Sequence, residues 1–262
     1  THPWNALGAV HAGMTKVVNV IPDNCPLGFH LVDGAFQTVQ SPSSYFRFRS
    51  FLELGPKGVM CPGVPADRIA MTGHYVDDEL VANAETDCAM RLRRRAENAP
   101  RRMLISIGGA GAQQELLVAI TRRILERVDT GDAALYINFG DHTKAWDLFR
   151  ERIAGFENRA AQHFQWDEAQ AFAQAALTGE VTGVHAFLNA DPFAAVYTTN
   201  LLMRAADVLI TKPSELAFYP VPKLLLERVG GHEAWGAVRS SELGDGRSEE
   251  RRVGKECRAR WS

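Results

Sequence analysis

The chain has 262 residues, of which 46% are hydrophobic and 23% are charged, and its formal net charge is −2. These proportions are typical of a globular protein and exclude collagen-like, disulfide-rich and intrinsically disordered chains. The charge gives no indication of bulk attraction to nucleic acid, and no apolar run approaches the roughly 20 residues that span a bilayer. We therefore expect a folded protein with no nucleic-acid partner.

Both ends of the chain are unusual. The first residue is Thr1 rather than Met, which we interpret as a truncated N-terminal domain. Residues 247–262 have no helical or strand periodicity and resemble a translated sequencing adapter, with a natural basic tail as the alternative. Setting this segment aside as a non-native tail removes six of the 29 basic and three of the 31 acidic residues, which leaves a net charge of −5.

Three cysteines lie outside that tail, at Cys25, Cys61 and Cys88. They form no Cys-x-x-Cys pair, so their spacing predicts neither a zinc site nor a disulfide framework. Reduced thiols are typical of cytoplasmic proteins. We therefore expect a cytoplasmic location and neither a bound metal nor a cofactor.

Residues 1–99 predict the remainder of an N-terminal α/β domain. Strands are expected at 17–21, 38–40 and 69–72, and helices at 42–54 and 77–99. Four arginines gather near the end of the second helix: Arg91, Arg93, Arg94 and Arg95. We interpret them as a solvated helix end that the helix dipole favours. Pro100 follows this helix, and we place the domain boundary there.

Residues 100–246 alternate regularly between strand and helix patterns. Strands are expected at 103–107, 134–139, 184–188, 207–211 and 223–227, and helices at 116–128, 144–154, 167–177, 192–206 and 232–242. Asp191 followed by Pro192 is a typical helix start. Strands separated by helices predict a doubly wound parallel sheet. The fold class is therefore α/β, with two Rossmann-like domains of which the first is truncated.

The carboxyl ends of the predicted parallel strands are where a ligand is expected. Residues 107–113 form a glycine-rich turn between a strand and a helix, which suits contact between backbone N–H groups and a phosphate. A tight packing turn is the alternative. As a dinucleotide-binding fingerprint the turn is incomplete, because Gln114 stands where the third glycine is required.

Two further loops follow later strands of the same predicted sheet. Lys212, Ser214 and Glu215 follow the fourth strand, and His232 with Glu233 opens a helix after the fifth. These side chains suit a phosphate and sugar hydroxyls. The alternative for each loop is structural: Ser214 as a helix cap, Lys212 as a surface charge and His232 as a cap or surface group.

These loops, in this order, resemble the nucleotide-binding domain of GT-B glycosyltransferases, in particular the group of monogalactosyldiacylglycerol synthase and of the enzyme that adds N-acetylglucosamine to lipid-linked muramyl peptide. The resemblance is carried by residues 108–113, by Ala-Asp-Val-Leu-Ile-Thr-Lys-Pro at 206–213, by Gly-His-Glu at 231–233 and by residues 63–76. Glu215 stands where the family has a second glycine. Pro220 stands near the position of the family's ribose-binding carboxylate, for which Glu215 is a candidate substitute.

The resemblance implies a glycosyltransferase that uses a nucleotide sugar, UDP-sugar by preference, without a metal. It places Gly109, Ala110, Gly111 and Gln113 on the diphosphate, Lys212, Ser214 and Glu215 near the phosphate or ribose, and His232 and Glu233 at the sugar. The family's catalytic histidine would precede Thr1, so we expect the chain as given to bind a nucleotide sugar without turning it over. Asp23 and His30 are the nearby candidates for the base, with a simple Asp-Asn turn at residues 23–24 as the alternative.

Other functions remain open at this point. A nucleotide-sugar epimerase and a non-catalytic nucleotide-sugar-binding module are the alternatives, and an NAD-dependent enzyme is a weaker one. The aromatic and basic run at residues 45–52 suits either an interfacial face that binds a membrane or a core helix with two solvated arginines. The expected partners are thus a nucleotide-sugar donor and an acceptor, with a lipid acceptor at the inner membrane face as one option.

Overall fold

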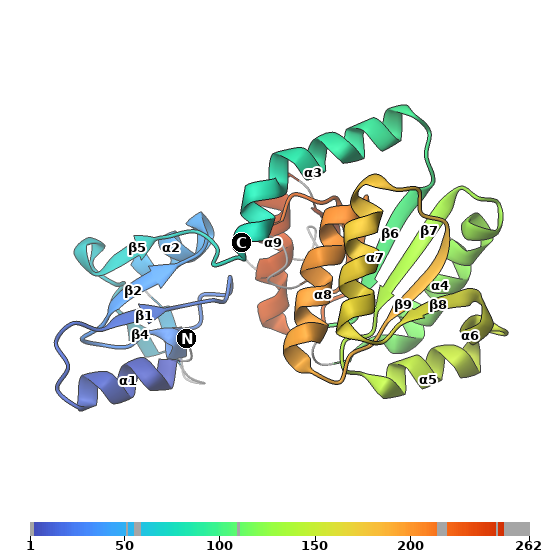
Figure 1. Cartoon of the computed structure of the whole chain (residues 1–262). Helices are drawn as coiled ribbons and strands as arrows, with labels where there is room; N and C mark the ends of the chain where they lie inside the picture. The colour runs from blue at the N-terminus through green and yellow to red at the C-terminus, as the bar shows by residue number, and fades with distance from the viewer. Residues whose placement is uncertain are drawn as a thin grey trace, which may run out of the picture.

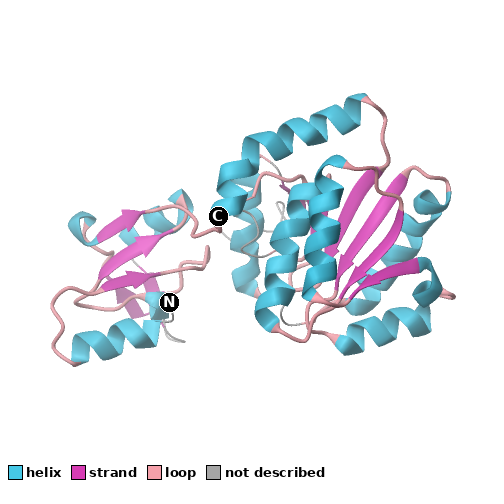
Figure 2. Ribbon diagram, in the orientation of Figure 1, coloured by secondary structure: helices cyan, strands magenta, loops and turns pink. Residues whose placement is uncertain are grey.

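The computed structural model describes residues 3–50, 52–54, 59–108, 111–213, 219–244 and 246–248. The chain forms a smaller N-terminal unit and a larger unit that begins with the long helix α3 (Figure 1). Both units combine helices with parallel strands, so the predicted α/β class is confirmed (Figure 2).

Three short parallel strands form the sheet of the smaller unit, in the order β1-β2-β5. Their bounds are Val18–Val20, Phe36–Val39 and Ile69–Met71. The helical elements are α1 (Pro3–His11), α2 (Pro42–Arg49) and the 3-10 turns η1 (Gly28–His30) and η2 (Ala66–Arg68). The buried core of this unit is small, and its main cluster consists of Ile21, Val39, Phe48 and Ile69.

Helix α2 is shorter than the sequence predicts. It begins as expected, because the side chain of Ser41 accepts a hydrogen bond from the backbone N–H of Ser44. It ends at Arg49, and Ser50 is already extended. Residues Leu52–Leu54, which we expected to be helical, form strand β3 and pair antiparallel with β4 (Val59–Cys61). Tertiary strand pairing overrides the local helical pattern there.

Seven parallel strands form the sheet of the larger unit, in the order β12-β11-β10-β6-β7-β9-β8. Their bounds are Arg101–Ser106 (β6), Ala133–Asn138 (β7), Ala160–His163 (β8), Gly183–Phe187 (β9), Val208–Thr211 (β10), Lys223–Leu225 (β11) and Gly246–Ser248 (β12). Five of them lie where the sequence predicts strands. The two edge strands, β8 and β12, were not predicted, and the expected start of the tail at residue 247 falls inside β12.

Helices cover both faces of this sheet (Figure 2). Their bounds are Asp78–Ala96 (α3), Gln114–Asp129 (α4), Thr143–Arg152 (α5), Phe156–Arg159 (α6), Trp166–Thr178 (α7), Pro192–Ala205 (α8) and Ala234–Glu242 (α9), with η4 at Gly231–Glu233. Alternate strand residues point to opposite faces: Ile105 packs with α4 and α5, whereas Leu104 packs with α7 and α8. The predicted start of α8 is confirmed, since Asp191 Oδ1 accepts from the backbone N–H of Phe193 at 3.0 Å.

Helix α3, which we assigned to the N-terminal domain, packs against the larger unit. Arg94 Nη2 lies 2.6 Å from Asp207 Oδ1, and Arg91 Nε donates to the carbonyl oxygen of Ala206 at 2.7 Å. Both arginines are buried, so the solvated helix end predicted for the arginine cluster is wrong at these two positions. The predicted exposure to solvent is confirmed for Arg93 and Arg95. The larger unit therefore includes α3, and the chain passes between the units before Asp78.

Candidate functional site

The candidate site lies where the larger sheet changes its winding direction. Strands β6 and β10 are neighbours, and the strands that follow them in the chain lie in opposite directions along the sheet, β7 beside β6 and β11 beside β10. Such a switch point opens a crevice at the carboxyl ends of the two strands. Gly108 follows β6 and Lys212 follows β10 there, and a Cβ on Gly108 would lie only 2.7 Å from Lys212 Cε. A side chain at position 108 would therefore require the end of the Lys212 side chain to shift.

The glycine-rich loop is folded tightly between β6 and α4. The N–H of Gly111 donates to the carbonyl oxygen of Gly108 at 2.7 Å, and Gly111 has a φ of 58°, in the left-handed region that favours glycine. Gln113 also has a positive φ, of 63°, and its side-chain amide donates to the carbonyl oxygen of Glu227. Gln113 Oε1 is buried without a hydrogen-bond partner among the described residues. Gly109 and Ala110, two of the expected diphosphate contacts, lie outside the described residues.

The loop stands directly before the N-terminus of α4, a helix of 16 residues. The first N–H groups of a helix lack intrahelical partners, and the helix dipole places partial positive charge at this end. The first helical turn carries one acidic residue, Glu115. The position of the loop thus suits an anion, as the sequence predicts.

His142 is a site residue that sequence reasoning missed. It follows β7 in the loop before α5, and its Nε2 lies 3.1 Å from the carbonyl oxygen of Gly108. A Cβ built on Gly111 would lie 3.3 Å from its ring, so the imidazole packs directly against the glycine-rich loop. The signal was present in the sequence, because His142 lies just beyond the carboxyl end of a predicted strand next to β6.

Lys212 and Glu233 form an ion pair across the crevice, and only 18% and 6% of their side chains are exposed. Glu233 Oε2 also accepts from the backbone N–H groups of Val229, at 2.6 Å, and Gly230, at 3.3 Å. Burial alone would raise the pKa of Glu233, but these hydrogen bonds and Lys212 outweigh it and hold the pKa below its ordinary value. Glu233 is therefore an ionised group that holds Lys212.

His232 is exposed beside this pair and faces the smaller unit. Its ring lies against Gly230, where a Cβ would come within 2.7 Å of Cε1. It is close enough to Asp23 of the smaller unit to lower the pKa of that carboxyl. The structure thus brings together one residue of each unit that the sequence singled out.

Asp23 and His30 form a hydrogen-bonded pair in the smaller unit. Asp23 Oδ2 lies 3.0 Å from His30 Nε2, with the histidine side chain 5% exposed and the aspartate 43% exposed. The hydrogen bond from His30 holds the pKa of Asp23 below its ordinary value, against a rise from burial. Asn19 Nδ2 donates to the backbone carbonyl of His30 at 2.7 Å and fixes the turn. Asp23 is therefore the accessible member, and His30 orients it.

The remaining predicted positions lie elsewhere. Ser214 and Glu215 are outside the described residues. Pro220, which aligns near the family's ribose-binding carboxylate, stands just before β11, and its carbonyl oxygen accepts from Arg91 Nη1 at 3.2 Å. That position is at the opposite end of the sheet from Lys212, so it contributes nothing to the crevice.

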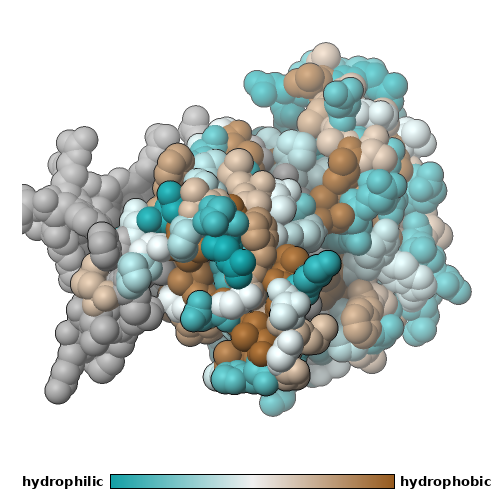
Figure 3. All heavy atoms as spheres, turned by 90° about the vertical axis from the view of Figure 1, so that its left-hand side faces the viewer, coloured by the Kyte–Doolittle hydropathy of each residue, from teal (hydrophilic) through white to brown (hydrophobic). Residues whose placement is uncertain are grey.

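Neither a group of metal ligands nor a helix that could span a membrane is found among the described residues. Within the described ranges, no group of three or more His, Cys, Asp or Glu side chains is placed to hold a metal ion. No helix there combines the length and apolar character that a membrane span requires. In the run at 45–52, Phe48 is a core residue, whereas Phe46 is 69% exposed and Phe51 lies outside the described residues. Figure 3 shows this side of the molecule, where hydrophobic and hydrophilic residues are interspersed.

Comparison with known families gives two matches. Residues 1–50 match the family described as Domain of unknown function (DUF6937). Residues 64–259 match the family described as Domain of unknown function (DUF6938). A search of curated proteins finds no match. The second match contains the whole crevice of the larger unit and covers more than half of the chain, and the chain therefore belongs to the family of the Domain of unknown function (DUF6938).

Proposed function

We propose that the larger unit binds a nucleotide sugar, UDP-sugar by preference, as the donor half of a GT-B-type glycosyltransferase. One observation carries the proposal: the glycine-rich loop and Lys212 meet at the switch point of the sheet, on the same unit as His232, which is near enough to Asp23 of the smaller unit to lower the pKa of that carboxyl. A donor in the crevice would have its diphosphate at the loop and its sugar toward the smaller unit.

The charged groups of the crevice suit the departure of a nucleoside diphosphate. Glycosyl transfer releases negative charge on the diphosphate, and prearranged N–H groups and a cation lower the energy of that charge. The start of α4 supplies the N–H groups and Lys212 supplies the cation. His142 keeps the loop in place through Gly108. This set of groups needs no metal ion to stabilise the leaving group.

Asp23 is our candidate for the base that accepts the proton of the acceptor hydroxyl. It is accessible, it is held by a buried histidine, and it faces His232. Its lowered pKa keeps it ionised at neutral pH and makes it a weak base, so departure of the diphosphate must supply most of the driving force. The acceptor would then enter along the smaller unit, whose exposed aromatic residues include Phe29 and Phe46.

A lipid acceptor and a peripheral position at the inner membrane face belong to the same proposal. Phe29 is 63% exposed and directly precedes His30, so an apolar acceptor chain would find contact area beside the base. Retention of the protein on vesicles containing anionic lipid, and loss of that retention in Phe29→Ser/Phe46→Ser, would support this location. Equal behaviour of the two proteins would contradict it.

Titration calorimetry with UDP, UDP-N-acetylglucosamine and NAD⁺ tests the donor class. We expect UDP and the UDP-sugar to bind and NAD⁺ not to bind. If neither uridine nucleotide binds, the proposal is wrong, and tight binding of NAD⁺ would favour a dehydrogenase instead. Product analysis with and without an acceptor then distinguishes a transferase from an epimerase, which would alter the sugar in the absence of any acceptor.

A further inference from the structure

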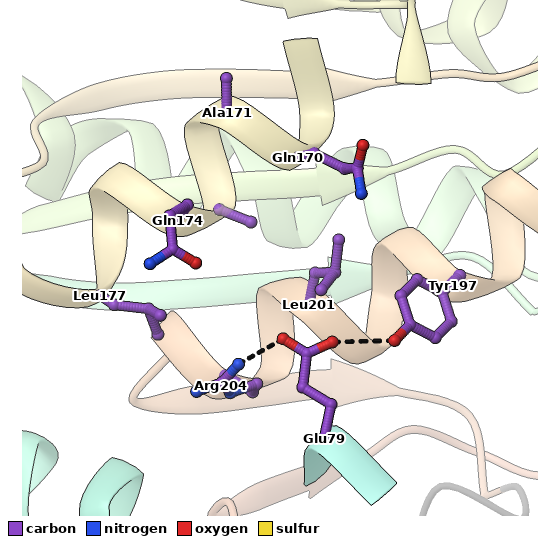
Figure 4. Close-up of a pocket in the computed structure, with 9 residues that line it drawn as sticks. Glu79, Gln170, Ala171, Gln174, Leu177, Tyr197, Leu201 and Arg204 are labelled. Carbon is purple, nitrogen blue, oxygen red and sulfur yellow. Dashed lines mark hydrogen bonds and ion pairs between the residues drawn. The ribbon is translucent and has the colours of Figure 1, made fainter. Parts of the chain in front are cut away.

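A second hollow lies in the larger unit, away from the ends of the strands. It is an open hollow between α7, α8 and the first turn of α3 (Figure 4). Its volume is about 420 Å³, and pockets that bind small molecules span about 300–1,000 Å³. We call it the α7–α8 groove; the polar and aromatic residues that line it are Glu79, Gln170, Gln174, Tyr197 and Arg204.

One end of the groove is a fixed polar cluster. Arg204, whose side chain is 9% exposed, donates to Glu79 Oε1 and, through Nε at 2.9 Å, to Asp87 Oδ2. Tyr197 OH donates to Glu79 Oε2 at 2.8 Å, and this hydrogen bond raises the pKa of Tyr197 to about 12. Glu79 and Asp87 both pair with Arg204, so this guanidinium is already committed and is not free to bind an anion.

The opposite wall offers uncommitted hydrogen-bonding groups. Gln170 and Gln174 lie one turn apart on α7, and both carboxamides point toward α8 (Figure 4). Neither has a hydrogen bond to another described residue, and both side chains are exposed. Each carboxamide provides two N–H donors and a carbonyl acceptor. Glu79 retains acceptor capacity across the groove, because each of its oxygens accepts one hydrogen bond.

An aromatic contact lies beside the groove, because Tyr197 lines it and Trp166 of α7 packs on Tyr197. Trp166 precedes Gln170 by four residues, so the two side chains share one face of α7. The rings of Trp166 and Tyr197 meet edge to face, with centroids 5.8 Å apart. Aromatic surface next to carboxamides and a carboxylate matches a ligand that has both C–H faces and hydroxyl groups.

We propose that the α7–α8 groove is a binding site for a neutral sugar of one or two rings. The carboxamides of Gln170 and Gln174 and the carboxylate of Glu79 bond its hydroxyls, and the ring of Tyr197 packs against a C–H face. The lining is too polar for an apolar ligand, and its one buried cation is already paired. This site is separate from the crevice at Lys212, and it exists whether or not the crevice binds a nucleotide.

Ligand-observed NMR and calorimetry with glucose, N-acetylglucosamine and maltose test the proposal, with glucose 6-phosphate and choline as charged probes. At least one neutral sugar is expected to bind, and Gln170→Ala/Gln174→Ala is expected to weaken that binding at least tenfold. Gln162→Ala, at an exposed carboxamide on β8, is the matched control and should bind as the unmodified protein does.

Tyr197→Phe provides a second variant, which keeps the ring and removes the donor that positions Glu79. It should weaken sugar binding severalfold while leaving UDP affinity unchanged. The proposal is overturned if none of the three sugars binds, if either charged probe binds more tightly than all of them, or if the double variant binds with unchanged affinity.

Discussion

The two units of the molecule differ in the size of the hydrophobic core that supports their candidate site residues. In the larger unit, seven strands are packed on both faces, and Lys212, Gly108 and His142 follow central strands. In the smaller unit, three short strands and a cluster centred on Phe48 support the loop that carries Asp23. Stability is not uniform across such a structure, and elements with few buried contacts open first. The unit with the larger core thus carries the groups proposed to bind an anion, and the unit with the smaller core carries the candidate base.

Helix α9 forms two hydrogen bonds with the smaller unit. Arg239 Nε lies 3.2 Å from His74 Nε2, and Ser43 Oγ donates to Glu242 Oε1 at 2.5 Å. Burial and the adjacent Arg239 lower the pKa of His74 to about 4, so this histidine accepts from Arg239 as a neutral ring. Both of these contacts are polar, and we expect that the two units can be perturbed separately.

The largest expected effect concerns the buried charges of the larger unit. Asp207 accepts from Arg94 Nη2 at 2.6 Å and from the backbone N–H of Arg102 at 3.0 Å. Asp207→Ala leaves both donors buried without this partner and should lower the free energy of unfolding by about 3–5 kcal/mol, measured in urea. Glu97→Ala, which removes the exposed pair with Arg93, is the control and should cost less than about 1 kcal/mol. Equal costs would mean that the buried pair adds nothing.

A cavity in the smaller unit should affect that unit alone. Phe48 is fully buried, and Phe48→Ala should cost about 3 kcal/mol, at the low end for such a change because the small core can relax. Hydrogen exchange should show lost protection in β1, β2 and β5 and retained protection in β6 and β7. Phe46→Ala, on the same helix but exposed, should change stability by no more than about 0.5 kcal/mol. Loss of protection in β6 and β7 as well would show that the units unfold together.

Removing the cation of the crevice should weaken nucleotide binding, and it should also lower stability because it leaves the buried carboxylate of Glu233 without its partner. Hydrogen bonds to charged groups contribute about 1.5–3 kcal/mol, so Lys212→Ala should weaken UDP binding by about 10–100-fold. The loss is reinforced because Glu233 then faces the phosphate without its partner. Lys16→Ala, an exposed lysine of the smaller unit, should bind UDP as the unmodified protein does. Unchanged affinity in Lys212→Ala would place the nucleotide elsewhere.

The smallest expected effect is a dependence of stability on pH. His185 Nδ1 lies 3.0 Å from His163 Nε2, and burial lowers the pKa of His185 to about 4 from an ordinary value of 6.5. Between these values the unfolded chain binds a proton that the folded chain does not, so stability should fall as pH decreases from about 6.5 toward 4. Melting temperatures of His185→Phe should show a shallower slope, while the exposed His11→Gln should keep the original slope.

Much of the larger unit was predictable because its strands are short apolar runs between helices of clear period. The start of α8 at Asp191 and Pro192 is a local signal, and the structure confirms it. The strand β8 was not predictable in this way, because Ala160–His163 contains neither an apolar run nor a β-branched residue. Its assignment depends on pairing with β9, which is tertiary information.

The sequence predicted which residues lie at the site better than it predicted what each of these residues does. Lys212, His232 and Glu233 were found because they follow strands, but the sequence does not show that Glu233 holds Lys212 across the crevice. Likewise, burial of Arg91 and Arg94 depends on partners more than 100 positions away. His142 was missed because a lone histidine in a turn has no distinguishing spacing. Local sequence patterns can locate such residues, but the role of each residue depends on its contacts with residues that are distant in the sequence.

The ion pair between Lys212 and Glu233 makes anion binding an exchange reaction. An incoming anion does not meet a free cation, because it must compete with a carboxylate that is already fixed by two backbone N–H groups. A singly charged anion would replace the single negative charge of Glu233 beside Lys212 by another single charge, so it would gain little binding free energy. A diphosphate would bring more negative charge and would also reach the N–H groups at the start of α4. Its binding free energy should therefore exceed the free energy needed to separate Glu233 from Lys212. Under the proposed function the crevice would therefore discriminate by valence: chloride or acetate should leave the Lys212–Glu233 pair intact, and a polyphosphate should displace Glu233 from Lys212.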